Sequence, residues 1–244
     1  MNTILPAMAP AQEEGWLALL ELHERKPTGW TLVGGQMVHL HCAERGTVPA
    51  RPTDDADTVL DVRAEPKVLY EFTKVLTAMG FDADGVTADG HQHRWKRGSA
   101  SIDILIPASL GPRATARRGY RGGTTVSAPG AQQALDRTED TPVTVAGITG
   151  TVRRPNLLGA LVSKAAAHSV PQDPGKERHL LDFALLTTLI APADMVGQAG
   201  ERDRKRLRAA IDALRGSPRT MAKIEGSDIG LARLELALRR GTSA

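Results

Sequence analysis

Three aspartates in two short segments have the residue type and spacing to hold divalent metal ions. Asp55 and Asp57 lie two residues apart in RPTDDADTVLDV, whose Val, Leu and Thr content predicts a β-strand. Side chains at positions i and i+2 of a strand leave the same face, so both carboxylates can reach one cation or a close pair. Asp103 lies between two isoleucines, where a carboxylate is costly to bury unless a cation pairs with it. The aspartates predict a metal site; the alternative for Asp103 is a solvated strand end.

A pair of glycines precedes the first two aspartates. Gly34 and Gly35 end WTLVGG, which predicts a short buried strand, and QMVHLHCAE after them predicts a helix. Backbone N–H groups at such a strand-to-helix turn can approach a phosphate closely, because glycine has no Cβ. Many glycine pairs only relieve a tight turn, so the pair indicates little by itself.

The segments that must position these residues predict alternating helices and strands. Apolar residues at helical spacing predict a helix over 11–26 and another over 65–81. The segments HQHRWKR and ASIDILIP predict two strands joined by a turn at Gly98. Elements that alternate in this way predict an α/β (α+β) fold, with a small mixed sheet and helices packed on it.

The second half of the chain predicts a different organisation. Residues 108–142 are rich in Gly, Arg, Ala and Thr without periodicity, which predicts a long, mobile insertion near a ligand. A hairpin is expected from Val143, and helices follow to the C-terminal end of the chain. We therefore expect a core of residues 1–150 with an N-terminal helix, and a helical C-terminal domain of residues 151–244 that packs on the active-site cleft.

Composition limits the possible classes of protein. The chain of 244 residues is 41% apolar, which is enough for a sizeable core. No apolar run reaches the ~18 residues that a membrane span needs, and the first residues lack the pattern of a secretory signal, so we expect a cytoplasmic protein without membrane contact. Cys42 is the single cysteine, so an intramolecular disulfide is impossible and a cysteine-built zinc site is implausible.

Charge gives a weaker indication of the partner. The net charge is +3 and the sequence pI is about 9.2, with 31 basic and 28 acidic residues. Two basic clusters stand out, namely Arg113, Arg117, Arg118 and Arg121, and then Arg202, Arg204, Lys205, Arg206 and Arg208. Such clusters fit contact with RNA, and a solvated helix face is the ordinary alternative.

The order of these motifs resembles the polymerase-β-like nucleotidyltransferase superfamily, and in particular its AbiEii-like branch, which includes toxins of toxin–antitoxin pairs. The residues that carry the resemblance are Gly34-Gly35, the run from Arg51 through Thr53 to Asp55 and Asp57, Asp103 within SIDILIP, Pro155 before the helix with Lys164, and then Lys176, His179 and Asp182. The resemblance covers roughly residues 30 to 190. It departs from the branch at Ala56, where a larger apolar residue is usual, and at Glu177-Arg178, which interrupts the usual pairing of a lysine and an aspartate near Asp182.

The resemblance implies a role for each of these residues. Asp55, Asp57 and Asp103 would hold two Mg²⁺ ions about 3.5–4 Å apart, which stabilise the charge that develops when a nucleotidyl group leaves a nucleoside triphosphate. Gly34 and Gly35 would admit the triphosphate, and Lys164 would neutralise its phosphate tail. Other residues would support the site: Asp182 would orient that lysine or contact the nucleotide, Arg51 and Thr53 would brace the carboxylate strand or contact phosphate, and Lys176 would belong to the nucleotide site.

The acceptor of the nucleotidyl group is a separate question. The AbiEii-like resemblance and the basic clusters favour RNA, possibly tRNA, as the acceptor of a toxin-like enzyme that an antitoxin protein counters. Two alternatives stay open: an antibiotic-modifying nucleotidyltransferase, and a catalytically silent relative that binds a nucleotide or a protein.

Overall fold

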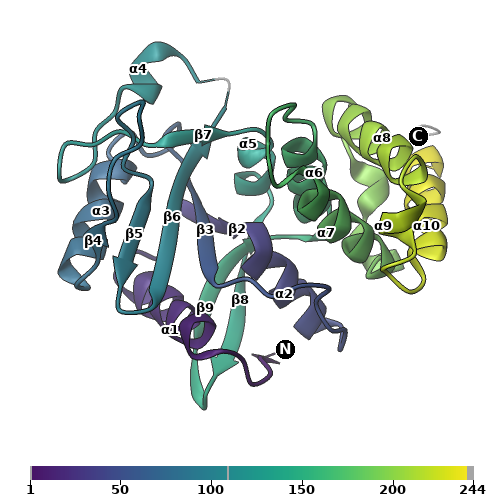
Figure 1. Ribbon diagram of the computed structural model, residues 1–244, viewed down its shortest axis with the longest axis horizontal. Coiled ribbons are helices and arrows are strands. Elements are labelled where there is room, and N and C mark those ends of the chain that lie inside the picture. Colours follow the sequence, from purple (N-terminus) through teal and green to yellow (C-terminus); the bar gives the residue numbers. More distant parts are fainter. Residues whose placement is uncertain (1, 109, 241–244) are drawn as a thin grey trace.

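A six-stranded mixed sheet forms one side of the molecule in the computed structural model, which describes residues 2–108 and 110–240 (Figure 1). The strand order is β2-β3-β6-β5-β4, and β7 pairs with the last part of β6. Its strands are β2 (Trp30–Val33), β3 (Asp55–Leu60), β4 (Asp82–Ala83), β5 (Arg94–Arg97), β6 (Ala100–Pro107) and β7 (Val126–Ala128). Strand β6 runs parallel to β3 and β7 but antiparallel to β5. The predicted α/β class with a mixed sheet is confirmed.

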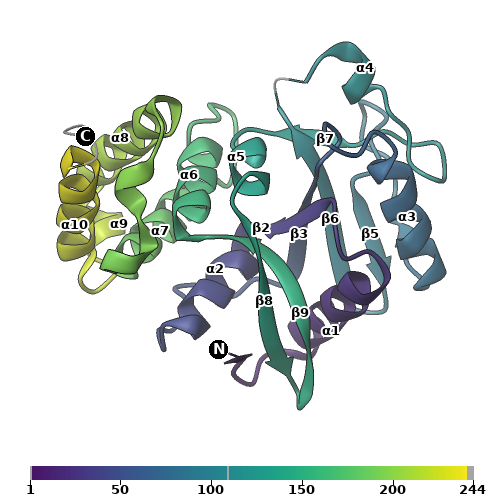
Figure 2. The same cartoon turned by 180° about the vertical axis from the view of Figure 1, so that it is seen from behind.

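A second, three-stranded sheet stands beside the first (Figure 2). It contains β1 (Thr3–Ile4), β8 (Thr138–Val145) and β9 (Ile148–Pro155), with β8 between the other two. The β8–β9 hairpin turns at Ala146 and Gly147, both with positive φ, and β9 packs on β2 and the first helix. This hairpin starts earlier than expected, and β9 runs through residue 150. The division of the chain into two domains stays a prediction.

Seven longer helices complete the architecture of the described residues, and shorter ones connect them. The longer helices are α1 (Pro10–Arg25), α2 (Gly34–Glu44), α3 (Val68–Ala78), α6 (Leu157–His168), α7 (Lys176–Thr188), α8 (Glu201–Arg215) and α10 (Ser227–Arg240). The shorter ones are α4 (Pro112–Thr115), α5 (Ala131–Leu135), α9 (Pro218–Met221), and the 3-10 turns Pro192–Asp194 and Val196–Gln198. Helices α6 to α10 gather on the side away from β4 and β5 (Figure 1).

One continuous apolar core connects the sheet with the helices. Trp16 of α1, Trp30 of β2 and Phe72 of α3 are almost completely buried in it, and the rings of Trp30 and Phe72 meet edge to face with centroids 6.2 Å apart. Each large apolar side chain buried in this way stabilises the fold by about 1.5–3 kcal/mol. The same core reaches Leu234 in α10, so the helical region packs on the rest of the chain.

Parts of residues 108–142, where the sequence predicted a long, mobile insertion near a ligand rather than core, form elements that pack on the rest of the chain. Strand β7 joins the main sheet. Ala131 and Ala134 of α5 are buried where that helix packs on the main sheet and on α6. The backbone N–H of Tyr120 donates to Thr73 Oγ1 of α3 at 2.8 Å, which anchors the loop before β7. These elements are only three to five residues long, too short to produce a period in the sequence. Ser109 lies outside the described residues.

No single helix of the described chain is long and apolar enough to cross a membrane. Helix α7 and the 3-10 segment Pro192–Gln198 reach such a length and composition only together, and the chain bends by 118° between them.

Candidate active site

A row of residues in register across four strands builds the site. Val33 of β2 is paired with Asp57 of β3, Asp57 with Asp103 of β6, and Asp103 with Arg94 of β5. Asp55 lies two residues before Asp57, on the same face of β3. One carboxylate oxygen from each of the three aspartates lies within 4.8 Å of the others. The structure therefore brings together the three carboxylates that the sequence singled out.

Burial and mutual repulsion make this cluster a strong site for cations. Asp103 is only 6% exposed and lies in the middle of β6, so the alternative of a solvated strand end is wrong. Burial, and then the negative charges of Asp55 and Asp103, raise the pKa of Asp57 to about 7. A divalent ion bound by oxygen ligands would remove that repulsion, so the donor set fits Mg²⁺.

Among residues 2–108 and 110–240, Arg94 is the cation that forms hydrogen bonds with this cluster. Its Nε and Nη2 donate to the two oxygens of Asp103 at 2.8 and 2.7 Å, and Nη2 lies 3.5 Å from Asp55 Oδ2. The hydrogen bonds to Asp103, followed by the charges of Asp103 and Asp55, raise the pKa of Arg94 above its ordinary value, so it stays charged. One permanent positive charge, that of Arg94, therefore lies next to the three carboxylates.

The glycine pair lies directly against the carboxylate strand. Gly34 begins α2 with φ +69°, and a Cβ at this position would lie 1.7 Å from Asp57 Oδ2. A Cβ on Gly35 would lie 2.5 Å from Thr53 Oγ1. Both positions therefore require glycine so that α2 can pack closely on the carboxylate strand. The sequence alone did not suggest this explanation for the glycine pair. Their predicted role toward a triphosphate stays a prediction.

A second set of charges links the segment before β3 to the helices α6 and α7. The guanidinium of Arg51 donates to both oxygens of Asp182 at 3.0 and 2.8 Å, and Lys164 Nζ donates to Asp182 Oδ2 at 2.8 Å. Burial by itself raises the pKa of Asp182, but the two cations and their hydrogen bonds outweigh it and hold the pKa below its ordinary value. Asp182 therefore stays ionised and fixes the position of Lys164.

Hydrogen bonds from α1 and α2 hold the start of the carboxylate strand. Thr53 Oγ1 donates to Asp55 Oδ1 at 3.1 Å, and Gln36 Nε2 donates to the carbonyl of Thr53 at 3.1 Å. Gln12 of α1 in turn donates to Gln36 Oε1 at 3.1 Å. This chain of contacts orients Asp55, whose side chain is 43% exposed.

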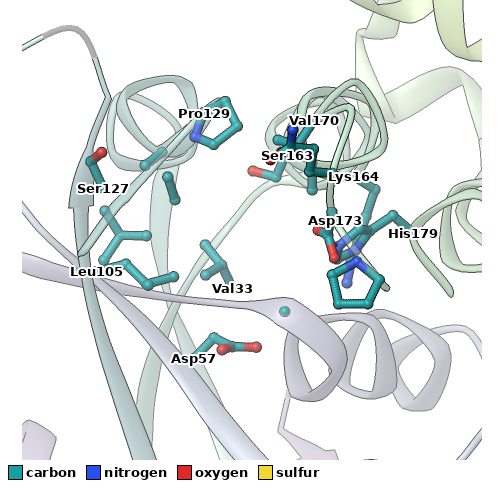
Figure 3. A pocket seen from close by; sticks show the side chains of 17 residues that line it. Val33, Asp57, Leu105, Ser127, Pro129, Ser163, Lys164, Val170, Asp173 and His179 are labelled. Atoms are coloured by element: carbon teal, nitrogen blue, oxygen red, sulfur yellow. Dashed lines mark hydrogen bonds and ion pairs between the residues drawn. The ribbon is translucent and has the colours of Figure 1, made fainter. Parts of the chain in front are cut away.

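A cavity of about 420 Å³ opens beside Asp57, between the sheet and α6 (Figure 3). Val33, Leu105 and Asp57 line it from the sheet, and Lys164 and His179 line it from the other side. Most of its other lining is apolar. The cavity has the size of small-molecule sites. Its charged groups are Asp57 on the wall of the sheet, and Lys164 and Asp173 on the opposite wall.

His179 is a lining residue that the sequence indicated only within the wider motif. Its Nε2 lies 2.9 Å from Asp173 Oδ2, and burial, followed by the charge of Lys164, lowers its pKa. Lys176 is different, because it is exposed at the first residue of α7 and is not among the residues that line the cavity. The predicted role of Lys176 gains no support from its position.

The basic clusters are only partly available to a ligand. Arg204 is 8% exposed and donates to three backbone carbonyls, and Arg206 donates to Gln133 Oε1 at 2.8 Å. In the other cluster, Arg117 donates to the carbonyl of Val62 and Arg121 pairs with Asp82. Arg204, Arg206 and Arg117 are thus used within the fold, which the clustering of charges in the sequence does not reveal, whereas Arg121 stays exposed at the surface.

The role of Arg94 was missed from the sequence, although a signal for it exists. The strands meet through Gly98 and Ser99, and a two-residue hairpin loop places Arg97 opposite Ala100. Three positions further from the turn on each strand, Arg94 of β5 is then paired with Asp103 of β6. The hairpin register therefore identifies the partner of the buried carboxylate.

Comparisons with known proteins found similar solved structures. No protein-family model matches the sequence, and no curated protein matches it. The chain is similar to the solution structure of the antibiotic-resistance factor ANT(2'')-Ia, with a TM-score of 0.47 and 17% identity over 87% of this chain and 99% of that one. It is also similar to the crystal structure of ANT(2'')-Ia in complex with adenylyl-2''-tobramycin, with a TM-score of 0.36 and 12% identity over 92% and 97% of the two chains.

Proposed function

We propose that this chain is a metal-dependent nucleotidyltransferase that moves a nucleoside monophosphate from a nucleoside triphosphate to a hydroxyl group. The observation that carries the proposal is the convergence of Asp55, Asp57 and Asp103, with one oxygen of each within 4.8 Å, beside a cavity that Lys164 also lines. Two bound Mg²⁺ ions would neutralise the charge that develops on the phosphate and lower the pKa of the attacking hydroxyl.

The residues of the site then have separate tasks in the reaction. Asp103 accepts the proton of the attacking hydroxyl, whose oxygen bonds to the α-phosphorus while the bond to the pyrophosphate oxygen breaks. Lys164 donates to the leaving pyrophosphate, because its ammonium has three donors and one of them holds Asp182. Arg51 and Thr53 keep Asp182 and Asp55 in place. The cavity, lined from the sheet and from α6, supports the proposed packing of a helical domain of residues 151–244 on a core of residues 1–150.

A catalytically silent nucleotide-binding protein is the main alternative from another class. Such a protein has no use for this cluster, in which burial and then the charges of Asp55 and Asp103 raise the pKa of Asp57 to about 7, because holding the three carboxylates together costs stability. Calorimetry distinguishes the two: tight binding of nucleotide without Mg²⁺, together with no turnover, would favour the silent protein.

The acceptor is the finer part of the proposal. Arg204 and Arg206 are used within the fold, which weakens the case for RNA, so we propose a small molecule with a free hydroxyl group as the acceptor. Aminoglycosides are the first class to test, since tobramycin carries the adenylyl group in the ANT(2'')-Ia complex. RNA stays the second candidate, because Arg202, Lys205 and Arg208 are exposed on α8. The AbiEii-like branch and an antitoxin partner stay predictions.

The test incubates the purified chain with Mg²⁺ and each of the four radiolabelled triphosphates, with tobramycin or total tRNA as the acceptor. We expect label to pass to one acceptor class and Asp57→Ala to abolish the transfer. Asp54→Ala is the matched control, because Asp54 is an exposed neighbour outside the cluster and its loss should leave the transfer unchanged. Equal transfer by the wild type and by Asp57→Ala would disprove the metal assignment, and label in tRNA alone would reverse the order of acceptors.

A further inference from the structure

The guanidinium of Arg94 lies where a metal ion would contact the oxygens of Asp103. Its planar guanidinium forms two parallel hydrogen bonds with Asp103, at 2.8 and 2.7 Å, and approaches Asp55 to 3.5 Å. Bidentate pairs of this kind are among the strongest polar contacts between side chains. Asp103 is 6% exposed, whereas the side chain of Arg94 is 38% exposed, so water reaches the pair from the arginine side.

A divalent ion and this guanidinium compete for the same carboxylate. Each oxygen of Asp103 keeps a second lone pair, but an ion bound there would lie within a few ångströms of the guanidinium charge. Arg94 already occupies both oxygens of Asp103 with its fork of two hydrogen bonds, and its charge offsets that of the carboxylate. An ion therefore binds Asp103 more strongly once Arg94 has moved away.

The surroundings of Arg94 allow that movement. Its side chain is 38% exposed, so the guanidinium has a path to water along the outer strands of the sheet. Its neighbours on β5 are committed elsewhere: Lys96 pairs with Asp84 at 2.7 Å, and Arg97 pairs with Glu21 at 2.8 Å. Lys164, a second cation whose charge acts on Asp57, is held by Asp182. Arg94 is thus the cation that stabilises the cluster when no metal is bound.

We propose that Arg94 is a built-in counter-ion, which neutralises Asp103 in the metal-free protein and which a divalent ion displaces when it binds. This inference rests on the proposed function, because it assumes that the carboxylates hold metal. Arg94 is thus a positioning residue that sets the affinity of the cluster for a divalent ion. It neutralises Asp103 before the ion binds, and it leaves Asp103 when the ion binds. Metal affinity is therefore lower than three free carboxylates would provide.

The test measures binding of Mn²⁺ alone to the full chain by electron paramagnetic resonance at pH 8, above the raised pKa of Asp57. We expect Arg94→Gln to lower the Kd for Mn²⁺ about tenfold or more. Lys96→Gln is the matched control, since it removes the same charge from the same strand, and its Kd should stay within about twofold of wild type. Arg94→Lys should fall between wild type and Arg94→Gln, because an ammonium cannot bond both oxygens in a fork. It also serves as the variant to compare if Arg94→Gln fails to fold.

The outcomes separate this inference from the proposed function. If the wild type binds Mn²⁺ and the Arg94 variants bind it no tighter, the counter-ion role is overturned while the metal site stands. If neither the wild type nor the Arg94 variants bind Mn²⁺, both proposals fall. Binding that tightens in Arg94→Gln and disappears when Asp57→Asn is added supports both.

Discussion

The packing of Gly34 on Asp57 yields a sharp prediction for Gly34→Ala. The new methyl group would lie 1.7 Å from Asp57 Oδ2 and 2.6 Å from its Cγ, distances that no real contact permits. Either the carboxylate must rotate out of the cluster, or the start of α2 must move away from β3. Both displace a proposed metal ligand relative to its partners.

The expected cost follows from two separate effects. An alanine in the left-handed region, here at φ +69°, costs about 1–2 kcal/mol. Relieving the overlap with Asp57 adds about 1–3 kcal/mol, as for other overpacked sites. We therefore expect a loss of about 2–5 kcal/mol in the free energy of unfolding. A displacement of about 1 Å in a catalytic group lowers activity roughly 100-fold, so nucleotidyl transfer should fall by at least that factor.

Gly46→Ala separates the overlap from the backbone strain. Gly46 has nearly the same φ, +62°, but a Cβ there meets no atom within 4 Å. This variant should lose only about 1–2 kcal/mol and keep both Mn²⁺ binding and transfer. Urea unfolding gives the stability, paramagnetic resonance the Mn²⁺ affinity, and the label-transfer assay the rate. If Gly34→Ala binds Mn²⁺ and turns over like Gly46→Ala, the close approach of Gly34 does not matter for the site and the reasoning is refuted.

Three further predictions concern the charges and the thiol. Without divalent metal, the Asp57 proton should contribute at most about 4 kcal/mol to the free energy of unfolding near pH 4 and lose this contribution by about pH 7, because the folded chain holds that proton more tightly than the unfolded one. Urea unfolding should therefore show the stability of the wild type relative to Asp57→Asn falling across this range, since the buried histidines of lowered pKa affect both proteins alike. A difference that does not change with pH would contradict it. Asp182→Ala should destabilise the fold by about 3–5 kcal/mol, since it leaves the buried Lys164 unpaired, and Lys164→Met should cost less, because Arg51 still pairs with Asp182. The reverse order in urea unfolding would be inconsistent with this pairing. Cys42 should resist iodoacetamide at pH 8 until the chain unfolds, because burial raises the pKa of its thiol to about 12. Mass spectrometry checks this, and rapid labelling of the folded chain would argue against it.

The sequence predicted well whatever depends on local spacing. Helical periodicity placed α1, α3 and the later helices, and β-branched and apolar runs placed β3 and β6. The separation of Asp55 and Asp57 by two residues is enough to put both on one face of a strand. The isolated charge in SIDILIP was enough to mark Asp103 as unusual. All of these signals lie within one element, where backbone geometry alone sets the direction of the side chains.

Tertiary structure alone decided which charges meet. Asp182 is 131 residues from Arg51 in the chain, yet it forms a bidentate pair with it. Arg204 looks like part of a basic surface in the sequence but bonds to backbone carbonyls inside the helical region. Short elements such as β7 and α5 form because the sheet and α6 offer them a surface to pack on. Periodicity records the face that a residue occupies, but the partner on that face is chosen by the packing of distant elements, and a single sequence carries no record of that packing.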